Sequence, residues 1–481
     1  MTGANTSAAV PQQPSTGDAL AESLPLTRAN RQWNLVDVSC VTSGFAIASW
    51  AFLFGGTTAQ LVGFWDGVFA IFVGNAIGVF LLALGIILPS AKWGTEFFVH
   101  QRSVYGPLGV LLFLLIGNVL PMFTWAALLA TMTGKAVAEI ARESFPPLPV
   151  GGEYLPMIVS LVVLFTAWRL VVRGSAGVRW INLLAAPLLV LLCVWLMFAI
   201  FSKVSFADIA AAPAIKPGPD RMKNIMLAIE LNIASGISFF NLAANLGRFA
   251  KTQRAALWGS FVGYVPVNGL AYVVGLASAL VLGSADPVTW MVPIVGPLGG
   301  AILLLILVLA NLSSLVCMAQ GNCQALVQIF GPRVQAFGWA GITRIFLLGA
   351  SAIVVLATDA LYDRFYTLFA FANAVLSPAC GIALADHVFL RRRQVNLRAL
   401  YEQHPGSDYY FWKRINPCAF AAMALGAWTC LGLMNPVTFE SAPAFTYLSA
   451  SVPAIVVAGA AHWVLARTIG IRMRWGAYPA R

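Results

Sequence analysis

The sequence contains little charge and few reactive side chains. Charged residues make up 10% of its 481 residues, whereas soluble domains average about 25%, so an ordinary soluble domain is excluded. The four histidines are scattered, and no nucleophile–base pair or HExxH pattern is present, so we do not expect an enzyme. The seven cysteines stand singly without metal-ligand spacing, which predicts small residues in helix packing rather than a metal site.

Long apolar runs dominate the chain instead. Hydrophobic residues account for 59% of it, and many segments reach the roughly 20 residues that cross a bilayer as a helix. We therefore predict an all-α polytopic membrane protein with about 12 transmembrane helices. The eighth span is too long for one straight helix, so we expect a re-entrant portion, a polar-lined portion or a turn before it. The expected spans are 37–62, 64–89, 106–134, 155–172, 180–201, 222–246, 254–283, 293–329, 336–357, 363–390, 415–433 and 443–466.

The net charge of +11 is explained by orientation in a membrane. Most of the 29 Lys and Arg residues fall between alternate spans, as the positive-inside rule requires, so nucleic-acid binding is not expected. Residues 1–33 contain no signal-peptide core and are expected to form a disordered cytoplasmic tail. An even number of spans returns the chain to the same side. We therefore predict a multi-pass protein of the cell (inner) membrane with both termini in the cytoplasm.

Four predicted spans contain clusters of polar residues and glycine. The first span has Gly-Gly-Thr-Thr at 55–58, the third has polar and aromatic residues near Trp125, and the sixth has four polar side chains between 232 and 241. The eighth contains ANLSSLVCMAQGN at 310–322. Polar groups and bare backbone at membrane depth are tolerated where they line a cavity or are buried in protein. Close helix packing explains any one such residue. The occurrence of these clusters in four spans, however, indicates that they line a pathway through the membrane.

The breaks predicted in spans one and six lie five spans apart. Corresponding broken helices are typical of transporters built from inverted repeats, and an odd offset inverts the second unit. We therefore expect a first five-helix repeat at 34–201, a second and inverted one at 202–393, two additional helices at 394–467 and a cytoplasmic tail at 468–481.

Three segments resemble one family of membrane proteins. They are GRFAKTQRAALWGSFVGYVPVNGLAYVVG after span six, LSPACGIALADHVFLRRRQVNLRALY at 376–401, and HQRSVYGPLGVLLFLLIGNVLPMFTWAALLATMTGKAV around span three. The second segment has the family's spacing of Pro378, Gly381, Asp386 and Arg391. Together they are similar to the nucleobase:cation symporter-1 family, the purine–cytosine permease group. The resemblance runs from about 37 to 467.

The resemblance implies a LeuT-type fold of two inverted five-helix repeats plus two helices, and uptake coupled to Na⁺ or H⁺. In Na⁺-coupled members the ion is bound by carbonyls of the broken first helix and by one carbonyl and two hydroxyls of span eight. The matching positions on span eight are Ala310, Ser313 and Ser314, and on span one we expect Ala48 and Ala51. Na⁺ is thus the expected coupling ion, and no cofactor is expected. The alternative is that both serines bond back to carbonyls one turn earlier.

The same resemblance implies a flat ring held between an aromatic residue of span three and one of span six. Met122 stands where cytosine permeases have Trp, with Phe123 next to it and Trp125 about one turn on. Trp125 and Phe239 are expected to face one cavity, with packing or lipid exposure as the alternative. The substrate-binding candidates are Trp50, Phe123, Trp125, Gly236, Ser238, Phe239, Gln320 and Asn322.

Glu230 is an acid about two turns into span six, and we treat it as a candidate proton site. The alternatives are contact with external water or pairing with Lys135.

These features predict a secondary-active symporter that imports a nucleobase or related heterocycle by alternating access. The alternatives are a transporter of another ring solute, such as allantoin, hydantoin, thiamine or a vitamin B6 form, or a sensor or channel on the same fold. A small heterocycle and the lipid bilayer are the expected partners. Nothing in the sequence bears on oligomeric state.

Overall fold

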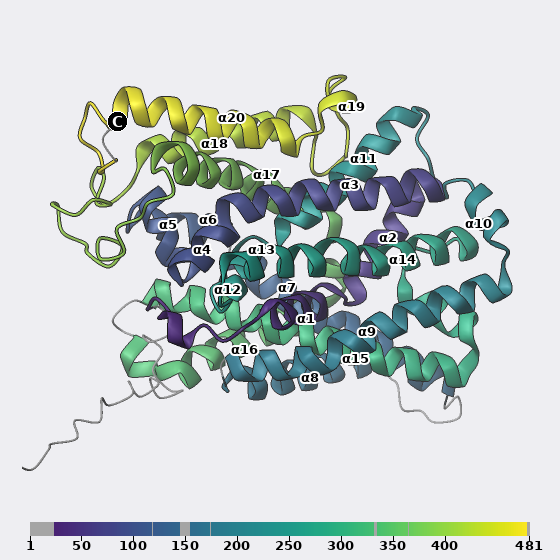
Figure 1. Cartoon of the computed structure of the whole chain (residues 1–481). Coiled ribbons are helices and arrows are strands. Elements are labelled where there is room, and N and C mark those ends of the chain that lie inside the picture. The colour runs from purple at the N-terminus through teal and green to yellow at the C-terminus, as the bar shows by residue number, and fades with distance from the viewer. Residues whose placement is uncertain are drawn as a thin grey trace, which may run out of the picture.

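The computed structural model describes residues 24–117, 119–144, 154–173, 175–330, 334–363 and 365–478. Within these ranges the chain is helical, and β-structure is limited to isolated bridges. The long helices run side by side, so the molecule has two ends (Figure 1). We call them the α5 end, where α5 (Phe97–Tyr105) and the C-terminal residues lie, and the α10 end, where α10 (Phe206–Ala211) lies.

Twelve apolar segments of the described chain account for the predicted spans. Eight are single spans, two are pairs of helices bent at a break, and two are shorter apolar helices, α8 (Leu155–Val171) and α18 (Pro417–Leu433). The bent pairs are α1 (Leu35–Ala46) with α2 (Ser49–Leu61), and α11 (Arg221–Ser238) with α12 (Phe240–Gly247). The single spans are Phe64–Trp93 (α3, Phe64–Leu82, to α4, Leu88–Trp93), Gly109–Glu139 (α6, Gly109–Gly117, and α7, Val119–Ser144), Gly177–Lys203 (in α9, Ser175–Lys203), Gln253–Leu282 (α13, Gln253–Val262, and α14, Asn268–Leu282), Leu298–Gln328 (in α15, Pro287–Phe330), Ala336–Leu356 (in α16, Val334–Asp363), Tyr366–Leu390 (from α17, Phe365–Leu384) and Ser451–Gly470 (from α20, Ser451–Leu465).

The predicted breaks in spans one and six are confirmed. The α1–α2 pair bends by 63° and the α11–α12 pair by 43°. Each break frees backbone groups that a continuous helix would pair. The polar residues of these two spans therefore surround unwound backbone inside the protein.

The helices pack in two groups. In one group α3 packs on α11 and α14 packs on α2, so the two broken spans lie beside α3 and α14. In the other group α7, α8, α15 and α16 pack on one another. Helix α17 contacts α11, and α18 and α20 pack against α17 on the outside of this core (Figure 1).

Glycine permits the closest of these crossings. A Cβ at Gly55 of α2 would lie 1.9 Å from the carbonyl oxygen of Tyr272 on α14, and one at Gly275 would lie 2.1 Å from the carbonyl oxygen of Phe52. Two backbones in direct contact are typical of membrane helices with small residues at the interface. The Gly-Gly-Thr-Thr cluster of span one therefore serves packing at this point.

The eighth span is preceded by a turn, which was one of the predicted alternatives, because Gly296 has a φ of +80° and splits α15 before Leu298. Two other parts of the chain differ from the prediction. The last span begins at Ser451 rather than 443, because Ser449 has a φ of +63° and separates the short α19 (Phe445–Leu448) from α20. Residues 97–105, which lie between two predicted spans, form α5.

The first 23 residues of the predicted tail 1–33 lie outside the described residues, as do 479–481 of the predicted tail 468–481. Residues 24–33, in contrast, pack on the protein. The Leu26 amide donates to the Gly94 carbonyl at 2.9 Å, Arg31 Nη1 donates to the Ala91 carbonyl at 2.9 Å, and Trp33 forms a bridge with Ala250. The expected disorder therefore does not extend to this segment.

A buried ion pair organises the α5 end. Arg391 Nε donates to Asp386 Oδ2 at 2.7 Å, and both side chains are 2% exposed. The Arg391 guanidinium lies 4.7 Å from the ring centroid of Tyr409 and 4.8 Å from that of Tyr478. It also donates to the carbonyl of Ser103 on α5 at 2.5 Å. One side chain thus joins α17, α5, the loop after α17 and the C-terminal residues.

A second buried contact holds α5 against α12. The Asn245 side chain accepts from the Phe97 amide at 2.8 Å and donates to Glu96 at 3.3 Å. The Glu96 carboxyl accepts from the Val99 amide at 2.9 Å, which caps the start of α5. Burial raises the pKa of Glu96, although these hydrogen bonds oppose that shift. The α5 end is therefore closed by specific polar contacts between α5 and α12.

Candidate functional site

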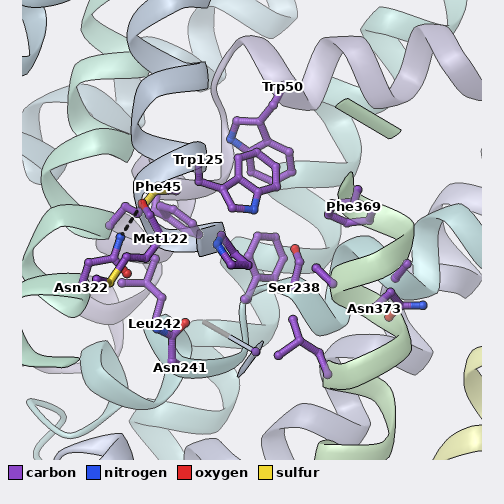
Figure 2. Close-up of a pocket in the computed structure, with 17 residues that line it drawn as sticks. Phe45, Trp50, Met122, Trp125, Ser238, Asn241, Leu242, Asn322, Phe369 and Asn373 are labelled. Carbon is purple, nitrogen blue, oxygen red and sulfur yellow. Dashed lines mark hydrogen bonds between the residues drawn. The ribbon is translucent and has the colours of Figure 1, made fainter. Parts of the chain in front are cut away.

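A cavity of about 70 Å³ lies where the two broken spans meet α7, α15 and α17. Figure 2 shows Trp50, Trp125 and Phe369 with Ser238, Asn241 and Asn322 around this space. The volume is several times the roughly 10–15 Å³ that one water needs. The lining consists of Phe45, Trp50, Gly117, Pro121, Met122, Trp125, Ala234, Ser238, Phe239, Asn241, Leu242, Met318, Asn322, Phe369, Ala372, Asn373 and Leu376.

Aromatic rings form much of the wall. The ring centroid of Trp50 lies 6.3 Å from that of Trp125 and 5.8 Å from that of Phe239, at interplanar angles of 75° and 62°. Trp125 also meets Phe369 edge-on at 6.0 Å. Phe239 is stacked on Tyr264 behind it at 4.1 Å, which fixes its orientation. These contacts fix the orientations of the rings that line the cavity.

The polar groups of the cavity are neutral. Ser238 Oγ donates to the Ser235 carbonyl at 2.6 Å, so its oxygen is left to accept. Asn322 Nδ2 donates to the Met122 carbonyl at 3.2 Å, so its Oδ1 is likewise an acceptor. The described lining contains no Asp, Glu, His, Lys or Arg. The site therefore suits an uncharged ligand, because a buried charge without a partner is costly.

Five of the predicted substrate residues line this cavity: Trp50, Trp125, Ser238, Phe239 and Asn322. They come from the first, third, sixth and eighth spans, and α17 adds a wall that the sequence did not indicate.

The other three predicted substrate residues lie elsewhere. Phe123 stacks on Phe346 of α16 at 5.8 Å, so it points away from the cavity. Gly236 packs on α3, where an added Cβ would lie 3.0 Å from the carbonyl oxygen of Asn75. Gln320 is buried but is not part of the lining. Met122 lines the cavity in place of Phe123. Its alignment with the Trp of cytosine permeases could have indicated this position.

Asn311 on α15 holds the break in the first span. Its Oδ1 accepts from the Ser49 amide at 2.8 Å, which satisfies an N–H at the start of α2. Its Nδ2 donates to Ser49 Oγ at 2.8 Å and to Thr133 Oγ1 of α7 at 2.9 Å. This side chain therefore fixes the start of α2 to α15 and α7, which belong to the other helix group.

A cluster of neutral oxygens lies beside the same break. Ser313 Oγ is 2.7 Å from the carbonyl oxygen of Gly44 and 2.8 Å from that of Ala310. The Gly44 carbonyl belongs to the last turn of α1, where carbonyls lack intrahelical donors. Ser314 Oγ is buried and has no hydrogen-bond partner among the described residues. Ser314 therefore has a hydroxyl that is not used within the described protein, next in sequence to the serine that contacts α1.

The first-span carbonyls expected at this site were those of Ala48 and Ala51. The Ala48 carbonyl accepts from the Ala51 amide at 2.9 Å in the first turn of α2. The Gly44 carbonyl, four residues before Ala48, contacts Ser313 of span eight. The alternative prediction was that both serines bond back to carbonyls one turn earlier in span eight. Ser313 does so, because its hydroxyl donates to the Ala310 carbonyl, but the same hydroxyl also contacts the Gly44 carbonyl of α1.

Glu230 binds the start of the last helix. It is 2% exposed, and its carboxyl accepts from the amides of Ala450 at 3.1 Å and Ser451 at 3.2 Å. Ser451 Oγ donates to it at 2.5 Å and Asn373 Nδ2 at 3.4 Å. Pairing with Lys135, one of the two alternatives considered for Glu230, is not among these contacts. Glu230 lies outside the central cavity but lines a second one of about 270 Å³ toward the α10 end.

The family of the chain follows from comparison with known proteins. The family model described as "Permease for cytosine/purines, uracil, thiamine, allantoin" matches residues 25–454. The chain belongs to this permease family and is a multi-pass membrane transporter. This agrees with the predicted resemblance.

Curated relatives are distant but extend over most of the chain. The hydantoin permease of Microbacterium maritypicum is 25% identical over 421 residues, which cover 83% of this chain and 82% of that protein. The purine-uracil permease NCS1 of Arabidopsis thaliana is 24% identical over 478 residues, 93% of this chain and 77% of that protein.

Solved structures show the same fold. Mhp1, a nucleobase-cation-symport-1 family transporter, in a closed conformation with bromovinylhydantoin bound, has a TM-score of 0.75 at 21% identity. The alignment covers 93% of this chain and 96% of Mhp1. A Na⁺-coupled sialic acid symporter in a substrate-bound outward-open state has a TM-score of 0.59 at 13% identity, covering 94% and 93%. The predicted LeuT-type fold is therefore confirmed.

Proposed function

We propose that this protein is a symporter that imports a neutral planar heterocycle, such as a nucleobase or related ring, together with Na⁺. The observation that supports this most is the cavity between the two broken spans, whose described lining combines aromatic faces and amides without an ionisable side chain. Aromatic faces stack on flat rings and exclude water. A cationic solute such as thiamine would leave its charge unpaired in this cavity.

Sodium coupling is supported by the oxygens beside the first break. Hard cations take several oxygen ligands. Carbonyls of Gly44 and Ala310 with the hydroxyls of Ser313 and Ser314 would supply four such oxygens without adding a buried charge. Bound there, the ion would join α1 to α15 and so link the two helix groups.

Uptake into vesicles tests the proposal. Purified protein in liposomes should concentrate a labelled ring, taken from uracil, cytosine, hydantoin and allantoin, when an inward Na⁺ gradient is applied. A channel dissipates gradients and cannot concentrate its solute, and a sensor does not move it. Equilibration without accumulation, or no uptake of any ring, would reject the symporter.

Trp125→Ala should weaken binding of the transported ring by roughly 5- to 150-fold, since stacking of one aromatic side chain on a base contributes about 1–3 kcal/mol. Trp125→Phe, which keeps an aromatic face, should retain most of the affinity. Binding is measured by equilibrium titration on protein whose folding is checked by thermal unfolding. An unchanged affinity in Trp125→Ala would remove Trp125 from the ring site.

We also propose that the α5 end faces the cytoplasm of the cell, because its loop after α17 is rich in Arg and Lys. Gln394 in that loop and Lys216 near α10 are both exposed. In intact cells Lys216→Cys should react with a membrane-impermeant maleimide, whereas Gln394→Cys should react only after permeabilisation. Six of the seven native cysteines are buried, which keeps the background low. Labelling of Gln394→Cys from outside would reverse the orientation.

A further inference from the structure

Asn241 stands apart from the other amides around the broken sixth span. Asn232, Asn245, Asn322 and Asn373 each use their side chains in hydrogen bonds within the protein. The Asn241 carboxamide makes no hydrogen bond with any described residue, although the residue is only partly exposed and lines the central cavity.

The break in the sixth span determines where this amide lies. Phe239 ends α11 and begins α12, and the 43° bend there directs the first turn of α12 along the cavity. Asn241 is the second residue of that turn. In Figure 2 it lies with Leu242 on the side of the cavity opposite Trp50, and Asn322 flanks the same region. The rings of Trp50 and Trp125 thus form one part of the wall and an unengaged amide another.

A primary amide has a specific chemical complement. Its N–H donor and C=O acceptor lie side by side, so it pairs through two hydrogen bonds with a ring edge that has a donor next to an acceptor. Lactam and imide edges, with adjacent N–H and C=O groups, have this pattern. Because no ionisable side chain lines the cavity, such a neutral edge can be bound without an unpaired charge.

We propose that Asn241 is a specificity-determining residue that binds the hydrogen-bonding edge of the ring, while Trp50, Trp125 and Phe239 contact its face. This proposal rests on the proposed function, because it assumes that a ring occupies the central cavity. According to this proposal, Asn241 of α12 discriminates between rings of similar size and shape. A ring whose complementary N–H is methylated should be rejected, since the amide oxygen is then left without its donor.

The experiment combines a protein change with a ligand change. The full-length protein and its Asn241→Leu variant, which has a side chain of similar size without polar atoms, are titrated with uracil and its 1-methyl and 3-methyl derivatives. If wild type prefers hydantoin, the hydantoin series is used. In wild type, methylation of the edge that pairs with Asn241 should weaken binding roughly 5- to 150-fold. In Asn241→Leu the unmethylated ring should be weakened by a similar factor, and methylation of that edge should add little.

Two further variants separate the outcomes. Phe123→Leu alters a side chain of α7 that points away from the cavity, so it should keep the wild-type order of the three rings. Asn241→Asp replaces the donor with a second acceptor, so it should weaken a lactam ring even if Asn241→Leu proves unstable. If wild type binds a ring while both Asn241 variants keep its affinity and methyl ranking, the assignment of Asn241 is wrong and the proposed function stands. If wild type binds none of the rings, the proposed function itself fails.

Discussion

Replacing Ser313 and Ser314 together by alanine should abolish the sodium dependence of substrate binding. In wild type, raising Na⁺ at constant ionic strength should tighten ring binding, because ion and substrate must change each other's affinity by the same factor. The double variant loses the Ser313 hydroxyl, which contacts the Gly44 carbonyl, and the unpartnered Ser314 hydroxyl, so the proposed site would keep too few oxygens for a cation. Its ring affinity should equal that of wild type without Na⁺, whatever the Na⁺ concentration. Equilibrium titration across a Na⁺ series measures this.

Ser278→Ala is the matched control. Its hydroxyl on α14 is also buried and without a hydrogen-bond partner among the described residues, yet it lies outside the oxygen cluster. This variant should keep the full Na⁺ dependence. If wild-type binding ignores Na⁺ and responds to pH, the sodium assignment is wrong, and Glu230→Gln becomes the variant to test for proton coupling.

Arg391→Ala should lower the free energy of unfolding by about 3–5 kcal/mol, the usual loss when one partner of a buried ion pair is removed. The Asp386 carboxylate would stay buried without its guanidinium, and the contacts of Arg391 with Tyr409 and Tyr478 would also be lost. Unfolding of the protein in detergent, followed by fluorescence, measures the change. Arg391→Lys should recover only part of it, since an ammonium cannot reproduce the planar stacking.

Arg392 provides the comparison for this prediction. It is adjacent in sequence but exposed, so Arg392→Ala should change stability by about 0.5 kcal/mol or less. Equal losses in the two variants would show that the loop as a whole, rather than the buried pair, determines stability at the α5 end.

The positions of the spans and their breaks could be predicted because they depend on local properties. An apolar run long enough to span a bilayer is recognisable in any context, and polar residues with glycine in such a run have few structural explanations. The candidates Ser313 and Ser314 came from the family resemblance, which matches a carbonyl at Ala310 with hydroxyls three and four residues later. The resemblance likewise indicated one aromatic residue on span three and one on span six, and Trp125 and Phe239 both line the central cavity.

Which neighbour faces the cavity could not be predicted in the same way. Phe123 and Met122 differ by about 100° around α7, and only the position of α16 determines that the phenylalanine packs outward. Likewise, the carbonyl that meets Ser313 depends on where α1 unwinds. The helix ends at Ala46, so Gly44 rather than Ala48 presents its oxygen. Met122 and Phe123 are adjacent, and Gly44 lies four residues before Ala48, so in each case the position of the neighbouring helix is needed to choose between the candidates.

The bond between Glu230 and the start of α20 has a consequence for biosynthesis. Its backbone donors, Ala450 and Ser451, lie 220 and 221 residues further along the chain. When the ribosome releases α11 toward the bilayer, those donors have not been made, and an acidic side chain within a membrane helix is costly until it has partners. The hydrogen bonds that Glu230 makes to these two amides can therefore form only after the start of α20 is synthesised. Helix α20 thus completes the polar contacts of a residue in the sixth span.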